Sequence, residues 1–299
     1  MTSTLVVILC QTRAHELTFN RFKNHLLDPL EADLAVCIGI ESPETVETTN
    51  DPFINNAKHK WFYTEPKDYE VCYNYAQNIE NPNLPIDNWK KALEIKHNLF
   101  GGINEYKNGG SCGILLFCRW FLLKCLKDTD CLNQYKHFII TRSDYYYDAY
   151  HPPISEFNDE FIWIPEGEDY NGITDRHIIL PSKYVEQVLS LITPIFHDPD
   201  TFVKELSYCK QWNIEQLIWY NMKKHNLLFK IIRFPLVMYT VRQDKDKTRW
   251  AAGEYIEEVG MFVKYRSEYL NVKKNKLLYA NWYEWITRNI ATFVHLHNF

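Results

Sequence analysis

Blocks of apolar residues and blocks of mixed polarity alternate along the chain, and they predict strands and helices in turn. Residues 5–10 form a continuous apolar run, the pattern of a strand that is buried on both faces of a parallel sheet. Residues 16–30 then place leucine and phenylalanine at near-helical intervals until Pro29, and a second apolar run follows at residues 33–40. A strand, a helix and a strand in this order require a crossover connection, so the pattern predicts a parallel α/β sheet.

The same blocks recur through the rest of the chain. Apolar runs predict further strands at residues 61–63, 137–140, 161–164 and 229–232, the last of which is expected to be the final strand, with residues 239–242 after it. Helical spacing predicts helices at residues 112–126, 183–192 and 214–225, whereas residues 66–88 are loop-like or weakly helical. From about residue 250 the pattern turns helical and rich in tryptophan and tyrosine. We therefore expect one Rossmann-like α/β domain over residues 1–245 and a helical, aromatic-rich extension over residues 246–299 packed on it.

Composition argues against several classes of partner. A formal net charge of −5 gives no broad positive field, which a protein that grips nucleic acid through its phosphates needs. The eight cysteines show no CxxC pair, so we interpret them as buried reduced thiols in a reducing compartment. The apolar run at residues 5–10 is too short for a signal peptide or a membrane span. We expect a cytoplasmic protein without a transmembrane segment.

Polar residues follow the strand predicted at residues 137–140. Ligands of open α/β sheets bind beyond the carboxyl ends of the strands, so Arg142, Ser143 and Asp144 are candidates for a site. A Mg²⁺ or Mn²⁺ ion that bridges two phosphates needs few protein ligands, and the Asp144 carboxylate could anchor one. The residues alone leave another interpretation open, in which Asp144 caps a turn and Arg142 pairs with a surface acid.

A second polar segment, residues 169–176, follows the strand predicted at residues 161–164. Gly172 permits a close backbone approach to a ligand. Asp175 could accept a proton from an attacking hydroxyl, and Arg176 could hold a phosphate or carboxylate in a forked contact. The alternative is a solvated turn that reverses the chain at its Asn-Gly step.

Four segments occur in an order that resembles a known family. They are Gln11-Thr12-Arg13, "TRSD" at residues 141–144, "IPEGEDYNGITDRHIILPS" at residues 164–182, and "NIEQLIWYNMKKHN" at residues 213–226. This order is similar to that of nucleotide-sugar glycosyltransferases of the A-type fold, over about residues 4 to 245. It is closest to the group found in bacterial polysaccharide clusters and large DNA viruses, in which "RSD" replaces the DxD motif and a "GINDR"-like segment follows.

The resemblance implies a hexosyl- or pentosyltransferase that moves a sugar from a nucleoside diphosphate, with UDP-linked sugars the expected donors, to a glycan hydroxyl. It implies that Asp144 coordinates Mn²⁺ or Mg²⁺ and the donor diphosphate, and that Arg142 lies beside the nucleotide. Because Arg142 fills the first acidic position of DxD, arginine side chains are an alternative to the metal. If Asp175 is the base, inversion at the anomeric carbon is slightly favoured.

The resemblance also implies roles for residues outside these two motifs. Thr12 and Arg13 would line the nucleotide pocket, and Gly172 would face the sugar and acceptor. Arg242 would close over the diphosphate. Glu215 has two possible roles, as an active-site acid or as an acid at a helix start that favours the helix dipole.

Other functions also suit a parallel α/β sheet. A dinucleotide oxidoreductase or a methyltransferase normally needs a glycine-rich turn after the first strand, and residues 11–15 contain no glycine. A non-catalytic carbohydrate-binding protein remains the main alternative, because 15% of the residues are aromatic and could form platforms for sugars. Residues 276–299 carry an apolar stripe that includes Trp282 and Trp285, which we interpret as packing rather than as a membrane-surface helix.

Overall fold

The structure is a computed structural model. It describes residues 3–95, 98–103, 110–154, 158–209, 212–243 and 253–278. The predicted stripe with Trp282 and Trp285 lies outside the described residues. No helix within the described ranges is long and apolar enough to cross a lipid bilayer.

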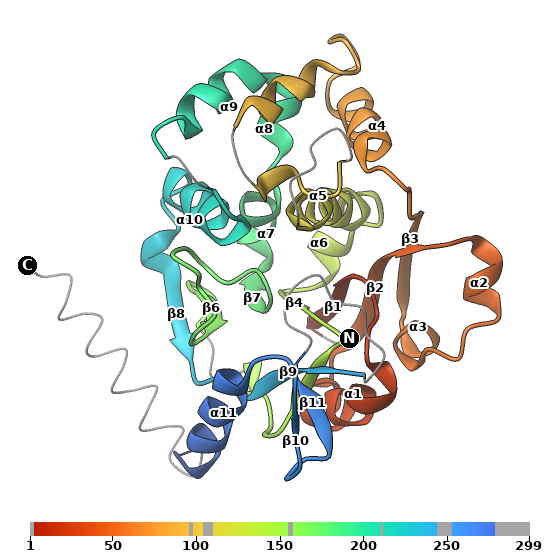
Figure 1. Cartoon of the computed structure of the whole chain (residues 1–299), viewed down its shortest axis with the longest axis vertical. Coiled ribbons are helices and arrows are strands. Elements are labelled where there is room, and N and C mark those ends of the chain that lie inside the picture. Colours follow the sequence, from red (N-terminus) through yellow and green to blue (C-terminus); the bar gives the residue numbers. More distant parts are fainter. Residues whose placement is uncertain are drawn as a thin grey trace, which may run out of the picture.

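Seven strands form the central sheet, in the order β3-β2-β1-β4-β7-β6-β8 (Figure 1). They are β1 (Thr4–Cys10), β2 (Asp33–Ile40), β3 (His59–Thr64), β4 (His137–Thr141), β6 (Ile162–Pro165), β7 (Ile178–Pro181) and β8 (Ile231–Phe234). Within this sheet, β7 is antiparallel to both of its neighbours and every other pairing is parallel. The predicted α/β class is therefore confirmed as a large, mostly parallel sheet compatible with a Rossmann-like fold.

The direction of the strand order reverses between β1 and β4. From β1 the chain moves to β2 and β3 on one side, and it later returns to β4 on the other side of β1. Loops that leave the carboxyl ends of two such strands diverge, and the crevice between them is where open α/β sheets bind ligands. The topology thus indicates one place for a site.

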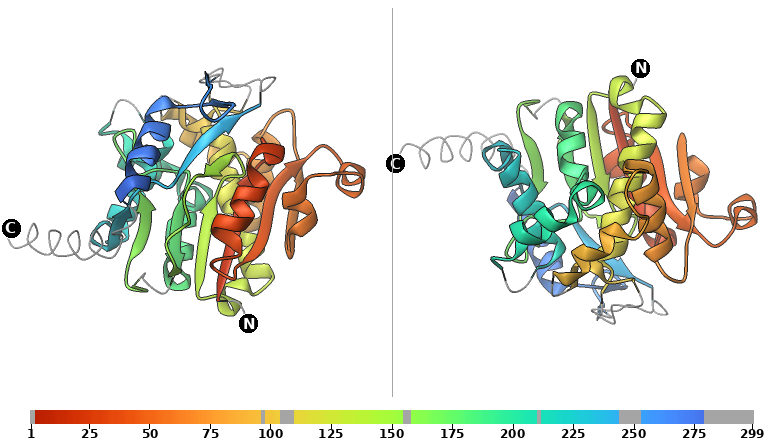
Figure 2. Two further views of the ribbon diagram at one scale, coloured as in Figure 1. Left: turned by 90° about the horizontal axis from the view of Figure 1, so that it is seen from below. Right: turned by 90° about the horizontal axis from the view of Figure 1, so that it is seen from above.

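Alternate side chains of β1 supply two hydrophobic cores, one on each face of the sheet. Leu5 and Val7 pack with the core that includes α5 (Cys112–Asp128), α7 (Ser182–Leu189) and α10 (Ile214–Lys224). Val6 and Ile8 pack with the core that includes α1 (His15–Phe22) and α11 (Arg266–Leu278). Figures 1 and 2 show these two groups of helices on opposite sides of the sheet. Because strand side chains alternate between faces, an apolar run buried on both sides follows directly.

A second sheet of four strands has the order β10-β11-β9-β5. Its strands are β5 (Tyr145–Tyr147), β9 (Met238–Arg242), β10 (Glu254–Ile256) and β11 (Met261–Val263). The prediction of helix from about residue 250 is wrong for β10 and β11, which form a hairpin beside β9, and it holds for α11. The aromatic residues of the hairpin pack across its strands, since the ring centroids of Tyr255 and Phe262 are 5.3 Å apart. This sheet continues across residue 245, where the sequence pattern places a domain boundary.

Shorter helices complete the fold. They are α2 (Pro43–Glu47), α3 (Pro52–Asn56), α4 (Glu70–Glu80), α6 (Cys131–Gln134), α8 (Thr193–His197) and α9 (Pro199–Leu206). A π-helical segment, Lys23–Leu27, continues α1, and 3-10 turns occupy Asn88–Glu94, Asn98–Phe100 and Leu228–Lys230. The helices predicted at residues 112–126, 183–192 and 214–225 correspond to α5, α7 and α10, whereas α4 is better formed than its sequence indicates.

Candidate active site

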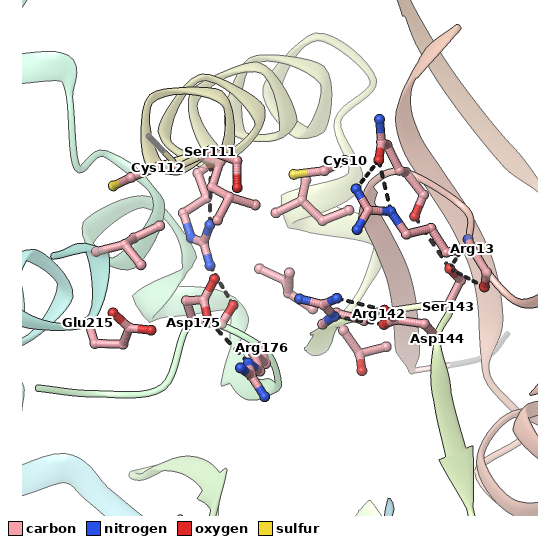
Figure 3. Close-up of a pocket in the computed structure, with 18 of the residues that line it drawn as sticks. Cys10, Arg13, Ser111, Cys112, Arg142, Ser143, Asp144, Asp175, Arg176 and Glu215 are labelled. Atoms are coloured by element: carbon pink, nitrogen blue, oxygen red, sulfur yellow. Dashed lines mark hydrogen bonds and ion pairs between the residues drawn. The ribbon is translucent and has the colours of Figure 1, made fainter. Parts of the chain in front are cut away.

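A cavity of about 480 Å³ lies at the carboxyl ends of β1 and β4, in the crevice that the topology indicates. Leu9 and Cys10 line it from the end of β1, and Ile140 and Thr141 line it from the end of β4. Its other walls come from the start of α5, the start of α10, the residues after β11, and Tyr170, Asp175 and Arg176 (Figure 3). The volume is within the range of about 300–1,000 Å³ that is common for small-molecule sites.

Charged side chains line much of this cavity. The cations are Arg13, Arg119, Arg142, Arg176 and Lys264, and the acids are Asp144, Asp175 and Glu215. Figure 3 shows Asp175 and Glu215 on one side of the cavity and Arg13 with Ser143 on the other. Because the cations outnumber the acids among the lining residues, the cavity suits an anionic ligand.

Two arginines bind the carboxylate of Asp144. Arg142 donates from Nε to Oδ1 and from Nη2 to Oδ2, each at 2.7 Å. Arg242 donates from Nη1 to Oδ2 and is itself buried. Burial alone would raise the pKa of the Asp144 carboxyl, but the charges and hydrogen bonds of these two arginines lower that pKa well below its usual range. Asp144 is therefore an ionised acid at neutral pH, and its charge is already compensated.

This pairing does not fit the metal-binding role that the resemblance implies for Asp144. Both carboxylate oxygens accept hydrogen bonds from guanidinium groups, so a divalent cation would have to displace at least one arginine. Within the described ranges, no group of three or more histidine, cysteine or acidic residues could hold a metal ion. Cationic side chains are therefore the groups that the described residues of this site present to an anionic ligand.

Ser143 connects the loops that follow β1 and β4. Its hydroxyl accepts a hydrogen bond from the backbone N–H of Arg13 at 2.7 Å, and its carbonyl oxygen accepts one from the Thr18 hydroxyl at 2.6 Å. Cys10 and Ala14 have left-handed backbone conformations, with φ of 76° and 49°, where the chain turns from β1 into α1. The sequence made Ser143 a candidate for the site but did not predict this linking role, because its partners lie 130 and 125 residues away.

Arg176 has internal partners, contrary to the expectation that it makes a forked contact with a ligand. Its Nη1 lies 2.6 Å from Glu268 Oε1 and 3.0 Å from Glu168 Oε2. Its guanidinium carbon also lies 4.8 Å from the centre of the Tyr265 ring. Glu268 belongs to α11, so Arg176 attaches the segment after β6 to the C-terminal helix while it lines the cavity.

Gly172 contacts the protein rather than the cavity. A Cβ atom at this position would lie 2.1 Å from the carbonyl carbon of Glu215, and the Ile173 N–H donates to Glu215 O at 3.0 Å. The missing side chain therefore lets the loop pack against the start of α10. The close backbone approach that the sequence predicts is made to a helix, and Gly172 is not among the cavity-lining residues.

Asp175 and Glu215 form an acidic pair in the cavity. The guanidinium of Arg119, within α5, donates from Nη2 to the backbone oxygen of Asp175 at 2.6 Å and so fixes that part of the loop. Burial, and after it the charge of Asp175, raises the pKa of the Glu215 carboxyl to about 7. A carboxyl with such a pKa can both release and accept a proton at neutral pH, which favours the active-site role for Glu215.

Lys264 lines the cavity from the residue after β11. Burial, and after it the charges of three neighbouring arginines, lowers the pKa of its ammonium group to about 7. These arginines are Arg142, Arg176 and Arg242, and the charge of Asp144 acts in the opposite direction. Sequence reasoning missed Lys264, because it lies in a segment that was expected to be helical.

The structure brings five of the eight expected site residues together at one cavity. They are Arg13, Arg142, Asp144, Asp175 and Arg176. Arg242 reaches Asp144 from β9 and lines a separate surface groove, and Thr12 lines neither cavity. No protein-family model and no curated protein matches this chain.

Proposed function

We propose that the protein is a glycosyltransferase that transfers a sugar from a nucleoside diphosphate, with UDP-linked sugars the expected donors, to a glycan hydroxyl. The observation that carries this proposal is a cavity at the β1–β4 switch point with Arg13 and Arg142 on one side and the acidic pair Asp175 and Glu215 on the other. A departing diphosphate requires positive charge, and an attacking hydroxyl requires a base. The cavity offers both within one volume.

In the proposed reaction the acceptor oxygen attacks the anomeric carbon of the donor sugar. The bond between that carbon and the diphosphate oxygen breaks, and its electron pair stays on the diphosphate. Arg142 and Lys264 stabilise the negative charge that develops there. Asp175 takes the proton of the acceptor hydroxyl. A base and a leaving-group site on opposite sides of the sugar favour direct displacement with inversion.

Glu215 supports Asp175 in this scheme. With a pKa of about 7, part of Glu215 is ionised at neutral pH, and this ionised form can accept the proton that Asp175 removes. The Arg119 contact to the Asp175 backbone keeps the base in place. The two carboxyls therefore act as one proton-accepting unit.

The test is incubation with a panel of nucleotide sugars and glycan acceptors, with release of free nucleotide as the readout, in Mn²⁺ and in EDTA. The Asp175→Asn variant should bind nucleotide within about twofold of the original affinity and should lose at least about 100-fold in turnover. Asp200→Asn is the matched control, because Asp200 is an exposed acid that pairs only with Lys91 among the described residues. Unchanged turnover in Asp175→Asn would remove this residue from the mechanism. Sugar binding without nucleotide release from any donor would instead support a carbohydrate-binding protein.

A further inference from the structure

The ammonium group of Lys264 lies in the cavity. No acid in the described part of the chain forms an ion pair with it. Its Nζ lies 4.7 Å from the centre of the Tyr265 ring. A lysine that lies half-buried in a cavity ordinarily has a carboxylate or a ligand as a partner, because burial of an unpaired charge costs free energy. The position of Lys264 therefore favours an anionic ligand as its partner.

The arginines near Lys264 already form ion pairs with the acidic residues of this region. Asp144 is bound by Arg142 and Arg242. Glu168 and Glu268 are bound by Arg176. The charges that Lys264 meets from the surrounding elements are therefore mostly positive, and its own charge is the uncompensated one in this part of the cavity.

Arg142 retains hydrogen-bonding capacity toward the same space. It uses Nε and Nη2 for Asp144, which leaves the two N–H groups of its Nη1 for another acceptor. Its side chain is 24% exposed, whereas that of Asp144 is 2% exposed. The cavity thus presents a guanidinium edge held in a fixed orientation by Asp144, together with a free ammonium group.

We propose that Lys264 and Arg142 bind the diphosphate of the ligand directly, in the place that a divalent cation would take, and that Lys264 takes up a proton when the diphosphate binds. This inference rests on the proposed function for the identity of the anion. A dianion beside Lys264 supplies the negative charge that compensates Lys264, and it stabilises the ammonium form. No metal ion is then needed to compensate the diphosphate charge.

The experiment is isothermal titration calorimetry of inorganic pyrophosphate and of UDP into the full chain at pH 7 in EDTA. Each titration is repeated in HEPES and in Tris, because the two buffers differ in ionisation enthalpy and so report the protons exchanged on binding. The original protein should bind both ligands in EDTA, and Lys264 should contribute about half a proton of uptake per site, since a group with a pKa of about 7 is half-protonated at this pH.

Two variants separate the charge of Lys264 from its titration. Lys264→Arg should keep the affinity within a few-fold and take up about half a proton less than the original protein, because a guanidinium stays charged. Lys264→Met should lose at least about tenfold in affinity and should show the same decrease in proton uptake. Lys274→Met, at an exposed position of α11, is the matched control and should behave like the original protein. Circular dichroism spectra of all variants check that they fold.

Two results would overturn the inference. The first is binding of pyrophosphate and UDP only after Mn²⁺ or Mg²⁺ is added, and the second is full affinity with full proton uptake in Lys264→Met. The proposed function fails separately. Suppose that binding in EDTA depends on Lys264 but no donor releases nucleotide. This result would contradict the proposed glycosyltransferase activity and would still support a diphosphate-binding site at Lys264 and Arg142.

Discussion

Replacing Glu215 by Gln should change how the stability of the protein depends on pH. The Glu215 carboxyl has a pKa of about 7 in the folded protein, against an ordinary value of 4.5. An acid whose pKa is raised by folding keeps its proton in the folded state while the unfolded chain loses it. Its contribution to stability is therefore lost as pH rises from about 4.5 through 7. A glutamine side chain has a similar shape and does not titrate.

The magnitude follows from the two pKa values. The difference between 4.5 and about 7 corresponds to at most about 3 kcal/mol, and most of it should develop between pH 5 and pH 8.5. Because the side chain is partly exposed and coupled to Asp175, we expect Glu215→Gln to gain about 2 kcal/mol relative to the original protein over this interval.

Urea unfolding at pH 5 and at pH 8.5 measures this gain directly. Glu257→Gln is the matched control, because Glu257 is exposed, and its stability relative to the original protein should be the same at both pH values. A stability difference for Glu215→Gln that does not change with pH would show that burial and Asp175 do not raise the pKa of Glu215 in the folded protein.

Two further substitutions test how the walls of the cavity are held. Gly172→Ala should cost at least about 2 kcal/mol in urea unfolding, because the added Cβ meets the Glu215 carbonyl at 2.1 Å. Gly167→Ala, where a Cβ meets no atom within 4 Å, should cost only about 1 kcal/mol for its left-handed backbone, and equal costs would reject the steric argument. Ser143→Ala should cost about 1–3 kcal/mol, since it leaves the Arg13 N–H without its acceptor. Ser207→Ala, an exposed control, should change the unfolding free energy by less than about 0.5 kcal/mol, and an equally small effect of Ser143→Ala would exclude a linking role.

The central strands were predictable because their burial imposes a simple pattern. β1 is buried at all seven positions, and after Thr4 its residues 5–10 are apolar without interruption, as burial on both faces favours. β7 was missed, since a four-residue strand directly before a helix has no periodicity of its own. The β10–β11 hairpin was missed for a similar reason, because three-residue strands with exposed aromatics resemble a helical pattern.

The position of the cavity was predictable and the pairing of its charged residues was not. Polar residues at the end of β4 indicated the edge of the sheet at which the cavity lies. The ion pair between Asp144 and Arg242 could not be predicted, because Arg242 lies 98 residues away in the sequence and reaches Asp144 only when β5 and β9 pair. The state of Lys264 depends on three arginines from separate elements, and no local pattern of residues reports such a cluster.

A crystal structure of the protein soaked with a UDP-sugar is the most direct test of the central claim, that the cavity between β1 and β4 binds a nucleotide-sugar diphosphate. The account predicts diphosphate oxygens within hydrogen-bond distance of Arg142 and Lys264, with the anomeric carbon facing Asp175. A nucleotide bound away from this cavity, or a sugar held on surface aromatics with the cavity empty, would contradict it.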